Sequence, residues 1–198
     1  MLDEFDSWVE PVKVQMGRPA PVSPEDFDVD RAGVYTALWF DPGMTTGWAL
    51  MSVWRVALAS EKYRVLNNIV AWSTGEFLGS EDQVIDQMAE LADAWDGNLD
   101  GIGLEDFILR KFTMGRELLA PVRVTSRFED RMYVTGRSSL LLPKQSASLA
   151  FSTVDDERLK RWGLYGPTVG KKDARAALKH TLTFFKNLKA HGLKEAGE

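Results

Sequence analysis

The fold is decided by the stretch VYTALWFDPG, residues 34–43, a nearly unbroken apolar run that ends in a turn. A continuous run of apolar, β-branched and aromatic residues is typical of a strand buried on both faces. Pro42 fixes φ and Gly43 permits positive φ, so we expect the strand to end directly after Asp41. Strand character resumes over residues 45–56, TTGWALMSVWRV, which predicts an antiparallel partner.

The rest of the sequence predicts strands that feed helices. Ser80 is expected to cap an amphipathic helix, and Pro121 must lie in the first turn of a later helix or bend it. Further strands are expected at 68–77, 101–105 and 139–142. Helical segments are expected at 81–96, 116–133, 144–151, 155–161 and 171–189. This order of elements indicates an α/β fold.

The composition limits the chemistry that the chain can use. Its 198 residues include no cysteine, which excludes disulfide scaffolds, thiol nucleophiles and cysteine-bound metals. No apolar run reaches the ~18 residues of a membrane span, and the acidic start MLDEFDSWVE lacks the basic region of a signal peptide. We therefore expect a cytoplasmic protein without membrane contact.

The chain divides into three expected parts. Residues 1–32 are acidic and rich in proline without sustained periodicity, which predicts an N-terminal arm. Residues 33–192 form the expected folded domain, and residues 193–198 form a tail. The arm either solubilises the protein or lies on a basic face.

Charge is distributed unevenly along the chain, although the formal net charge is only −5. Residues 1–106 carry 6 Lys/Arg against 20 Asp/Glu, whereas residues 107–194 carry 18 against 7. Such asymmetry points to a polyanionic partner, and the alternative is a set of solvated helix faces.

Two carboxylates end predicted central strands. Asp41 closes the first strand, and Glu105 closes the strand GIGLE at 101–105. Ligands of open α/β sheets lie outside the carboxyl ends of strands, so these two acids converge if their strands are neighbours. Two carboxylates at such a short distance repel one another unless a cation lies between them. The alternative for Asp41 is an ordinary turn residue.

A third acid stands at the start of the last predicted helix. Asp173 is the only acid within KKDARAALKH, residues 171–180, and it shares a helical face with Ala176, Ala177 and His180. The side chains of Asp173, Ala176 and Ala177 are small enough for this face to pack closely on a sheet, so Asp173 is expected to point toward the sheet. The alternative is an acid that stabilises the helix dipole. Three carboxylates suit Mg²⁺ or Mn²⁺, because hard cations take oxygen ligands.

These motifs, in this order, resemble those of RuvC-type Holliday-junction resolvases within the ribonuclease H-like superfamily. Asp41-Pro42-Gly43 with TGWA at 46–49 resembles the first motif, and EDF at 105–107 resembles the second. PKQS at 143–146 is similar to a later basic turn, and KDARAAL at 172–178 to the C-terminal helix motif. The likeness covers roughly residues 34–190 and is narrowest with RuvC-like proteins encoded by actinobacteriophages.

The resemblance implies a mixed five-stranded sheet flanked by helices and a homodimer in the bacterial cytoplasm. It implies an endonuclease that resolves four-way junctions, and possible flap and fork substrates, by two-metal hydrolysis with Mg²⁺ or Mn²⁺. Asp41, Glu105 and Asp173 would be catalytic and hold the metals, with help from His180. The family's helix motif has a second functional position three residues later, normally Asp, where this chain has Ala176.

The resemblance also gives the basic residues a use. Phosphate contacts supply most of the affinity of proteins for DNA. Phe107 occupies the place of a family aromatic that stacks on an unpaired base, and its alternative is a core side chain. The expected DNA-binding residues are Phe107, Arg110, Lys111, Arg116, Lys144, Lys171, Lys172 and Arg175.

Two other functions remain open from the sequence. The first, motivated by Ala176, is a catalytically impaired RuvC-like protein that binds DNA or acts as a scaffold. The second is an actin-like ATPase or sugar kinase, which also opens with a strand, an Asp and a Gly hairpin but needs a longer chain for its nucleotide-binding half.

Overall fold

A computed structural model describes residues 33–60, 64–107 and 119–191 of the chain. In this part of the chain, five strands form one mixed sheet flanked by helices, in the order β3-β2-β1-β4-β5. The strands are β1 (Val34–Asp41), β2 (Thr45–Trp54), β3 (Ile69–Leu78), β4 (Gly101–Asp106) and β5 (Gln145–Ser146). The helices are α1 (Arg55–Ala59), α2 (Glu81–Ala94), α3 (Ala120–Val134), α4 (Ala147–Thr153), α5 (Asp156–Arg161) and α6 (Lys172–His191). Short 3-10 turns lie at Leu66–Asn68 (η3), Ser138–Leu140 (η5) and Gly166–Thr168 (η6).

The first three strands form an antiparallel meander, and the sheet then continues in parallel. β1 pairs antiparallel with β2, and β2 with β3. On its other side β1 pairs parallel with β4, which in turn pairs parallel with β5. The predicted hairpin after Asp41 and the predicted third strand are therefore confirmed. β2 ends at Trp54, two residues earlier than expected, because the chain turns into the short helix α1.

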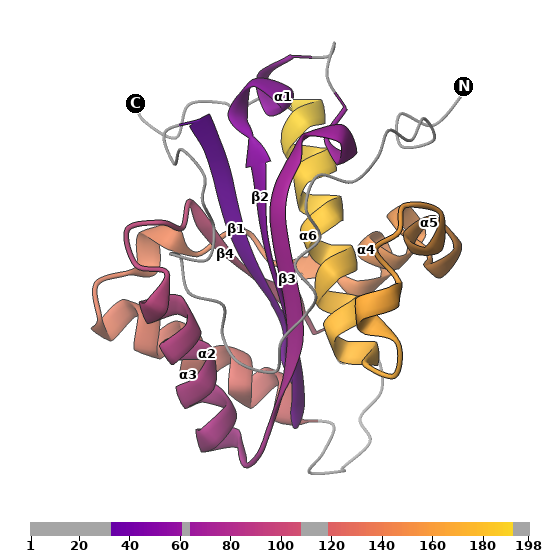
Figure 1. The fold of residues 1–198 in the computed structure, drawn as a ribbon. Coiled ribbons are helices and arrows are strands. Elements are labelled where there is room, and N and C mark those ends of the chain that lie inside the picture. The colour runs from indigo at the N-terminus through magenta and orange to yellow at the C-terminus, as the bar shows by residue number, and fades with distance from the viewer. Residues whose placement is uncertain (1–32, 61–63, 108–118, 192–198) are drawn as a thin grey trace.

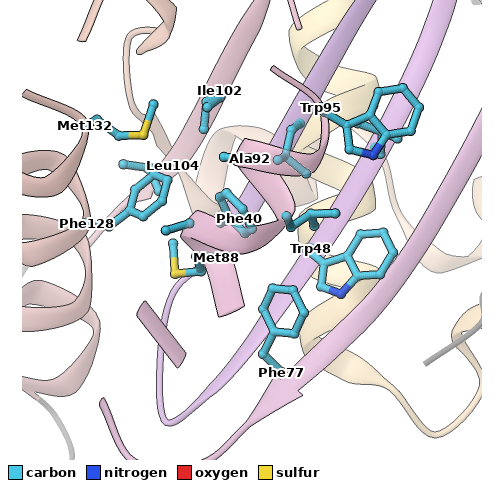
Figure 2. Close-up of a cluster of buried hydrophobic side chains, with 14 of the residues drawn as sticks. Phe40, Trp48, Phe77, Met88, Ala92, Trp95, Ile102, Leu104, Phe128 and Met132 are labelled. Carbon is cyan, nitrogen blue, oxygen red and sulfur yellow. The ribbon is translucent and has the colours of Figure 1, made fainter. Parts of the chain in front are cut away.

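Helices cover both faces of the sheet (Figure 1). Alternation along the strands sends side chains to a core on each face. α2 and α3 cover one face, where Phe40 and Leu104 pack with Phe128 of α3. Figure 2 shows this cluster, which includes Trp48 and Phe77 from the meander. α6 crosses the opposite face with a second set of buried side chains. Burial of a side chain such as Phe40 contributes roughly 1.5–3 kcal/mol, so both faces stabilise the sheet.

Three helices begin as their capping residues predict. Ser80 accepts a hydrogen bond from the backbone of Gln83 and forms a capping box at the start of α2. Asp155 accepts a hydrogen bond from the backbone N–H of Arg158 at the start of α5, and Ser146 accepts one from that of Leu149 at the start of α4. Pro121 lies in the first turn of α3, where its missing N–H removes no helical bond.

Two predictions near the sheet edge are wrong. The run 139–142 forms no strand: residues 138–140 make the turn η5, and Leu141 makes only an isolated bridge to Ile102. Pro143 follows directly, and proline has no N–H to donate to a ladder. The expected helix at 144–151 begins later, because Gln145 and Ser146 pair with the end of β4 as strand β5.

Candidate active site

Parallel pairing places Asp41 and Glu105 at the same edge of the sheet. Phe40 of β1 is in register with Leu104 of β4, and the two acids are the next residues along. Because side chains alternate along a strand and Phe40 and Leu104 face the α2–α3 core, both acids project from the opposite face. The expected convergence of the two strand ends is observed, on the face that α6 covers.

The first turn of α6 brings Asp173 to this edge. Its N-terminal amides are held by β3: Oε1 of Glu76 accepts hydrogen bonds from the N–H of Asp173 at 3.0 Å and of Ala174 at 3.2 Å. Gly47, paired with Glu76 across the β2–β3 ladder, leaves room for this turn. A Cβ at Gly47 would lie 1.9 Å from the carbonyl oxygen of Asp173, so the helix rests directly on the backbone of β2.

The three acids line one pocket of about 370 Å³. Its walls come from the ends of β1 and β4, from α4, from α5 and from the first two turns of α6. The lining residues are Asp41, Glu105, Phe151, Asp156, Lys172, Asp173, Arg175, Ala176 and Lys179. The pocket therefore has an acidic side on the sheet and a largely basic side on α6. Ala176, at the position where the resemblance leads us to expect a further acid, lies on its wall.

His180 lies one turn beyond Ala176, under the pocket. Its side chain is fully buried, with Nε2 3.4 Å from Oε2 of Glu105, and neither ring nitrogen makes a hydrogen bond among the described residues. The imidazole stacks parallel to the ring of Trp39 at a centroid distance of 5.8 Å. Gly103 makes room for Trp39, because a Cβ there would lie 2.1 Å from the indole. His180 thus supports Glu105 from within the core.

The electrostatics of the pocket reflect the crowding of acids. Burial, a hydrogen bond with Glu105 and the charges of Glu105 and Asp173 raise the pKa of Asp41 well above its usual value. Burial also acts to raise the pKa of Glu105, but contacts with His180 and Asp41 outweigh it and lower that pKa. The pair therefore disfavours ionisation of both carboxyl groups at once, and the pKa of Asp41 is the one that is raised.

Asp173 belongs to the same electrostatic group. Burial raises its pKa, the ammonium of Lys172 opposes this rise, and the charges of Glu76 and Glu105 add to it. Burial and mutual repulsion thus disfavour the simultaneous ionisation of Asp41 and Asp173. A site that keeps acids in this state favours protons or cations as ligands.

Only some of the expected DNA-binding residues meet at the pocket. Lys172 and Arg175 line it, whereas Lys171 lies partly buried immediately before α6. Phe107 is partly exposed directly after β4, and the exposed Lys144 pairs with Glu129 at 2.9 Å. The predictions for Arg110, Lys111 and Arg116, like the arm 1–32 and the tail 193–198, fall outside the described residues.

Four arginines of the basic half of the chain are paired with the acidic half. Arginines of α3 and the turn after it face carboxylates of α2 and its C-terminal turn, and all these pairs join segments more than 40 residues apart. The pairs are Arg123–Glu81, Arg127–Asp82, Arg131–Asp86, Arg137–Asp93 and Arg137–Asp96. Four of the 18 basic residues in 107–194 therefore belong to an interhelical ladder in which each arginine already faces a carboxylate.

Sequence reasoning missed Glu76, Phe151 and Asp156. Glu76 acts through backbone amides of a distant helix, which leave no mark in the sequence. Asp156 follows the capping residue Asp155 and reads from the sequence as an acid in the first turn of α5. Lys179, one of the basic residues that flank Asp173 in the sequence, lies one turn after Arg175 on α6.

Three further findings accompany this geometry. Within the described ranges, no three His, Asp or Glu side chains are placed so that they bind one metal ion together. No helix in the same ranges is long and apolar enough to cross a membrane. Comparison of the chain with protein families, curated proteins and solved structures gives no match.

Proposed function

We propose that the protein is a divalent-metal-dependent endonuclease that cleaves branched DNA, with the ribonuclease H-like architecture and the chemistry of RuvC-type junction resolvases. One observation carries the proposal: Asp41, Glu105 and Asp173, which come from three elements far apart in the sequence, line a single pocket. The sheet order supports it, because β1 lies between β2 and β4 and its end shares an edge with the end of β4.

The donor set fits Mg²⁺ or Mn²⁺. Asp41, Glu105 and Asp173 supply carboxylate oxygens, and hard cations prefer oxygen ligands. In the absence of a cation these acids share protons, as the raised pKa of Asp41 indicates. Since the side chains as placed form no complete ligand set, the proposal rests on their chemistry and their common pocket. A bound divalent ion would supply Lewis-acid activation of the phosphodiester and of water.

The chain's own residues divide the remaining work. Glu105 has the buried imidazole of His180 beside it at 3.4 Å, and Asp173 stands in the helix turn whose backbone N–H groups Glu76 accepts. Asp41 must release its proton before its oxygens can bind a cation, so its environment sets the pH at which the site is ready. Lys172 and Arg175 stand on the opposite wall, where a negatively charged strand needs cations.

A second candidate is a catalytically impaired relative that binds branched DNA or acts as a scaffold. Ala176 favours it, because this alanine lines the pocket on the helix that carries Asp173. An acid there would add a fourth carboxylate to the wall. The two candidates share the DNA partner and differ only in whether strands are cut.

A cleavage panel tests the proposal. Labelled four-way junctions, flaps, forks and linear duplexes are incubated with Mg²⁺ or Mn²⁺ and the wild-type protein, Asp41→Asn or Glu105→Gln. The exposed Asp130 on α3 provides a matched control, Asp130→Asn. We expect nicking of branched DNA by the wild type and the control, and at least a ~100-fold loss in both site variants.

The same panel separates the two candidates. Junction binding without nicking by the wild type, together with nicking by Ala176→Asp, would favour the impaired relative. Retained cleavage in both Asp41→Asn and Glu105→Gln would refute the site. Light scattering of the junction-bound protein tests the expected homodimer, since symmetric nicking needs two copies.

A further inference from the structure

On the α6 side of the pocket, two cations meet one carboxylate. Nζ of Lys179 lies 2.6 Å from Oδ1 of Asp156, and Nε of Arg175 lies 3.4 Å from the same oxygen. Arg175 and Lys179 are one turn apart on α6, so they present their charges to the same point. Asp156 reaches that point from the first turn of α5. The contact is therefore an anion held by an arginine and a lysine.

Both cations are unusually well fixed for surface side chains. The side chain of Lys179 is 12% exposed, and its ammonium lies 4.8 Å from the centroid of the Phe151 ring. The side chain of Arg175 is 20% exposed, and its guanidinium lies 5.0 Å from the centroid of the Tyr165 ring. Aromatic faces attract cations and exclude water, which orients both groups before any ligand arrives.

The anion at this position is stabilised in its charged form. Burial acts to raise the pKa of Asp156, but the hydrogen bond and charge of Lys179 and the charge of Arg175 outweigh it and lower that pKa. A phosphate oxygen resembles a carboxylate oxygen in charge and hydrogen-bonding capacity, and arginine binds both groups in the same way. The environment that favours ionised Asp156 therefore also suits a phosphate.

The position of this contact gives it a use. Asp156, Arg175 and Lys179 line the same pocket as Asp41, Glu105 and Asp173. A volume of about 370 Å³ lies within the range of about 300–1,000 Å³ for ligand sites. A DNA strand whose phosphate enters the acidic side is repelled by the carboxylates, so neighbouring phosphates need a positive wall. Within the described ranges, α6 supplies that wall.

We infer that Arg175 and Lys179 form a phosphate-binding subsite for the DNA strand, and that Asp156 occupies this subsite as an internal competitor in the free protein. The inference rests on the proposed function, because it takes DNA as the ligand. Binding of the strand replaces the Asp156 carboxylate by a backbone phosphate beside the one that is cleaved. In the free protein, the Asp156 carboxylate thus occupies the place of a substrate phosphate, in addition to linking α5 to α6.

Junction affinity measured by fluorescence anisotropy without divalent ions tests the inference. Asp156→Asn removes the competitor and should tighten binding about three- to fivefold. Glu157→Gln is the matched control, because Glu157 lies next in α5 and pairs with Lys160 at 2.6 Å. It removes the same charge from the same turn and should change affinity by less than about twofold.

Salt dependence identifies the cation. Lys179→Gln should weaken binding and reduce the slope of log affinity against log salt by about 0.9, the value for one phosphate contact, whereas Lys179→Arg should retain the slope. In a Lys179→Gln background, the gain from Asp156→Asn should be smaller than in the wild type, because only Arg175 still faces Asp156. Thermal unfolding confirms that each variant is folded. If Asp156→Asn does not fold, the salt slopes of Lys179→Gln and Lys179→Arg test the subsite without it.

Two results would overturn the subsite alone: binding by Asp156→Asn no tighter than by Glu157→Gln, or an unchanged salt slope in Lys179→Gln. In both cases the wild type still binds and cleaves junctions, so the proposed function stands. A wild-type protein that neither binds nor cleaves branched DNA would remove the proposed function and this inference with it.

Discussion

Replacing Gly47 by alanine tests how the first turn of α6 reaches the sheet. A Cβ at this position would lie 1.9 Å from the carbonyl oxygen and 2.0 Å from the carbonyl carbon of Asp173, and 2.5 Å from the nitrogen of Ala174. These are backbone atoms, so no side-chain rotation relieves the clash. Ordinary contact begins at 3.4 Å, and the first turn of α6 must therefore retreat by about 1.5 Å.

The retreat has two expected consequences. Overpacking of this kind lowers the free energy of unfolding by about 1–3 kcal/mol. It also moves Asp173 away from Asp41 and Glu105, and a misplacement of about 1 Å can lower a reaction rate ~100-fold. We expect Gly47→Ala to remain folded, to nick junctions at least ~100-fold more slowly, and to lose most of the thermal stabilisation by Mn²⁺.

Urea unfolding and junction nicking with Mn²⁺ measure both effects. Gly166→Ala is the control, because a Cβ at Gly166 meets no atom within 4 Å. Wild-type unfolding and nicking by Gly47→Ala would refute the reasoning, since α6 would then not depend on this close approach. Lost stability with wild-type nicking would separate the packing of α6 from the position of Asp173.

Three further predictions concern the cap, the ladder and the shared proton. Glu76→Ala should lower the free energy of unfolding by about 1 kcal/mol in urea, because two backbone N–H groups lose their acceptor, whereas Glu76→Gln keeps an oxygen and most of the stability. Arg127→Gln should change the free energy of unfolding by less than about 1 kcal/mol, and junction affinity by less than about twofold, because Arg127 is an exposed partner of Asp82. Mn²⁺ affinity, followed by calorimetry at several pH values, should rise with pH up to the raised pKa of Asp41 and then level off, because the ion competes with the proton.

Each of these has a contrary result. Equal free energies of unfolding for Glu76→Ala and the wild type would contradict a stabilising role of Glu76 at the start of α6. A large loss of junction affinity in Arg127→Gln would show that Arg127 contacts the DNA. The raised pKa of Asp41 also fixes the sign of a second pH effect. The folded protein without metal holds this proton more tightly than the unfolded chain does, so the free energy of unfolding should fall as pH rises from the usual pKa of an aspartate toward the raised one. A Mn²⁺ affinity independent of pH, or one that falls as pH rises, would contradict the expected pH dependence of Mn²⁺ binding.

The meander and the long helices could be predicted from local pattern. The run at 34–40 and the turn at Pro42-Gly43 carry their own signals, and Ser80 marks the start of α2. The sheet edge could not be predicted, since residues 139–142 are as apolar as a strand. They do not pair as a strand, because Pro143 follows them and the end of β4 pairs with Gln145 and Ser146 instead.

The candidate site divides in the same way. Asp41 and Glu105 could be found because strand ends mark a position in the sheet, and alternation then decides which face they share. Glu76 could not be found, because it acts on amides of a helix nearly 100 residues later. The ion pairs between α2 and α3 could not be predicted for a related reason. Charge counts along the chain do not say which charges meet across a pair of helices.

Crystals soaked in Mn²⁺ test the central claim most directly, because anomalous scattering locates the ion without reference to activity. The account predicts a peak in the pocket with oxygens of Asp41, Glu105 and Asp173 as ligands at about 2.1 Å, and its loss in Asp41→Asn crystals. An empty pocket at saturating Mn²⁺, or an ion that binds none of these three carboxylates, would contradict it.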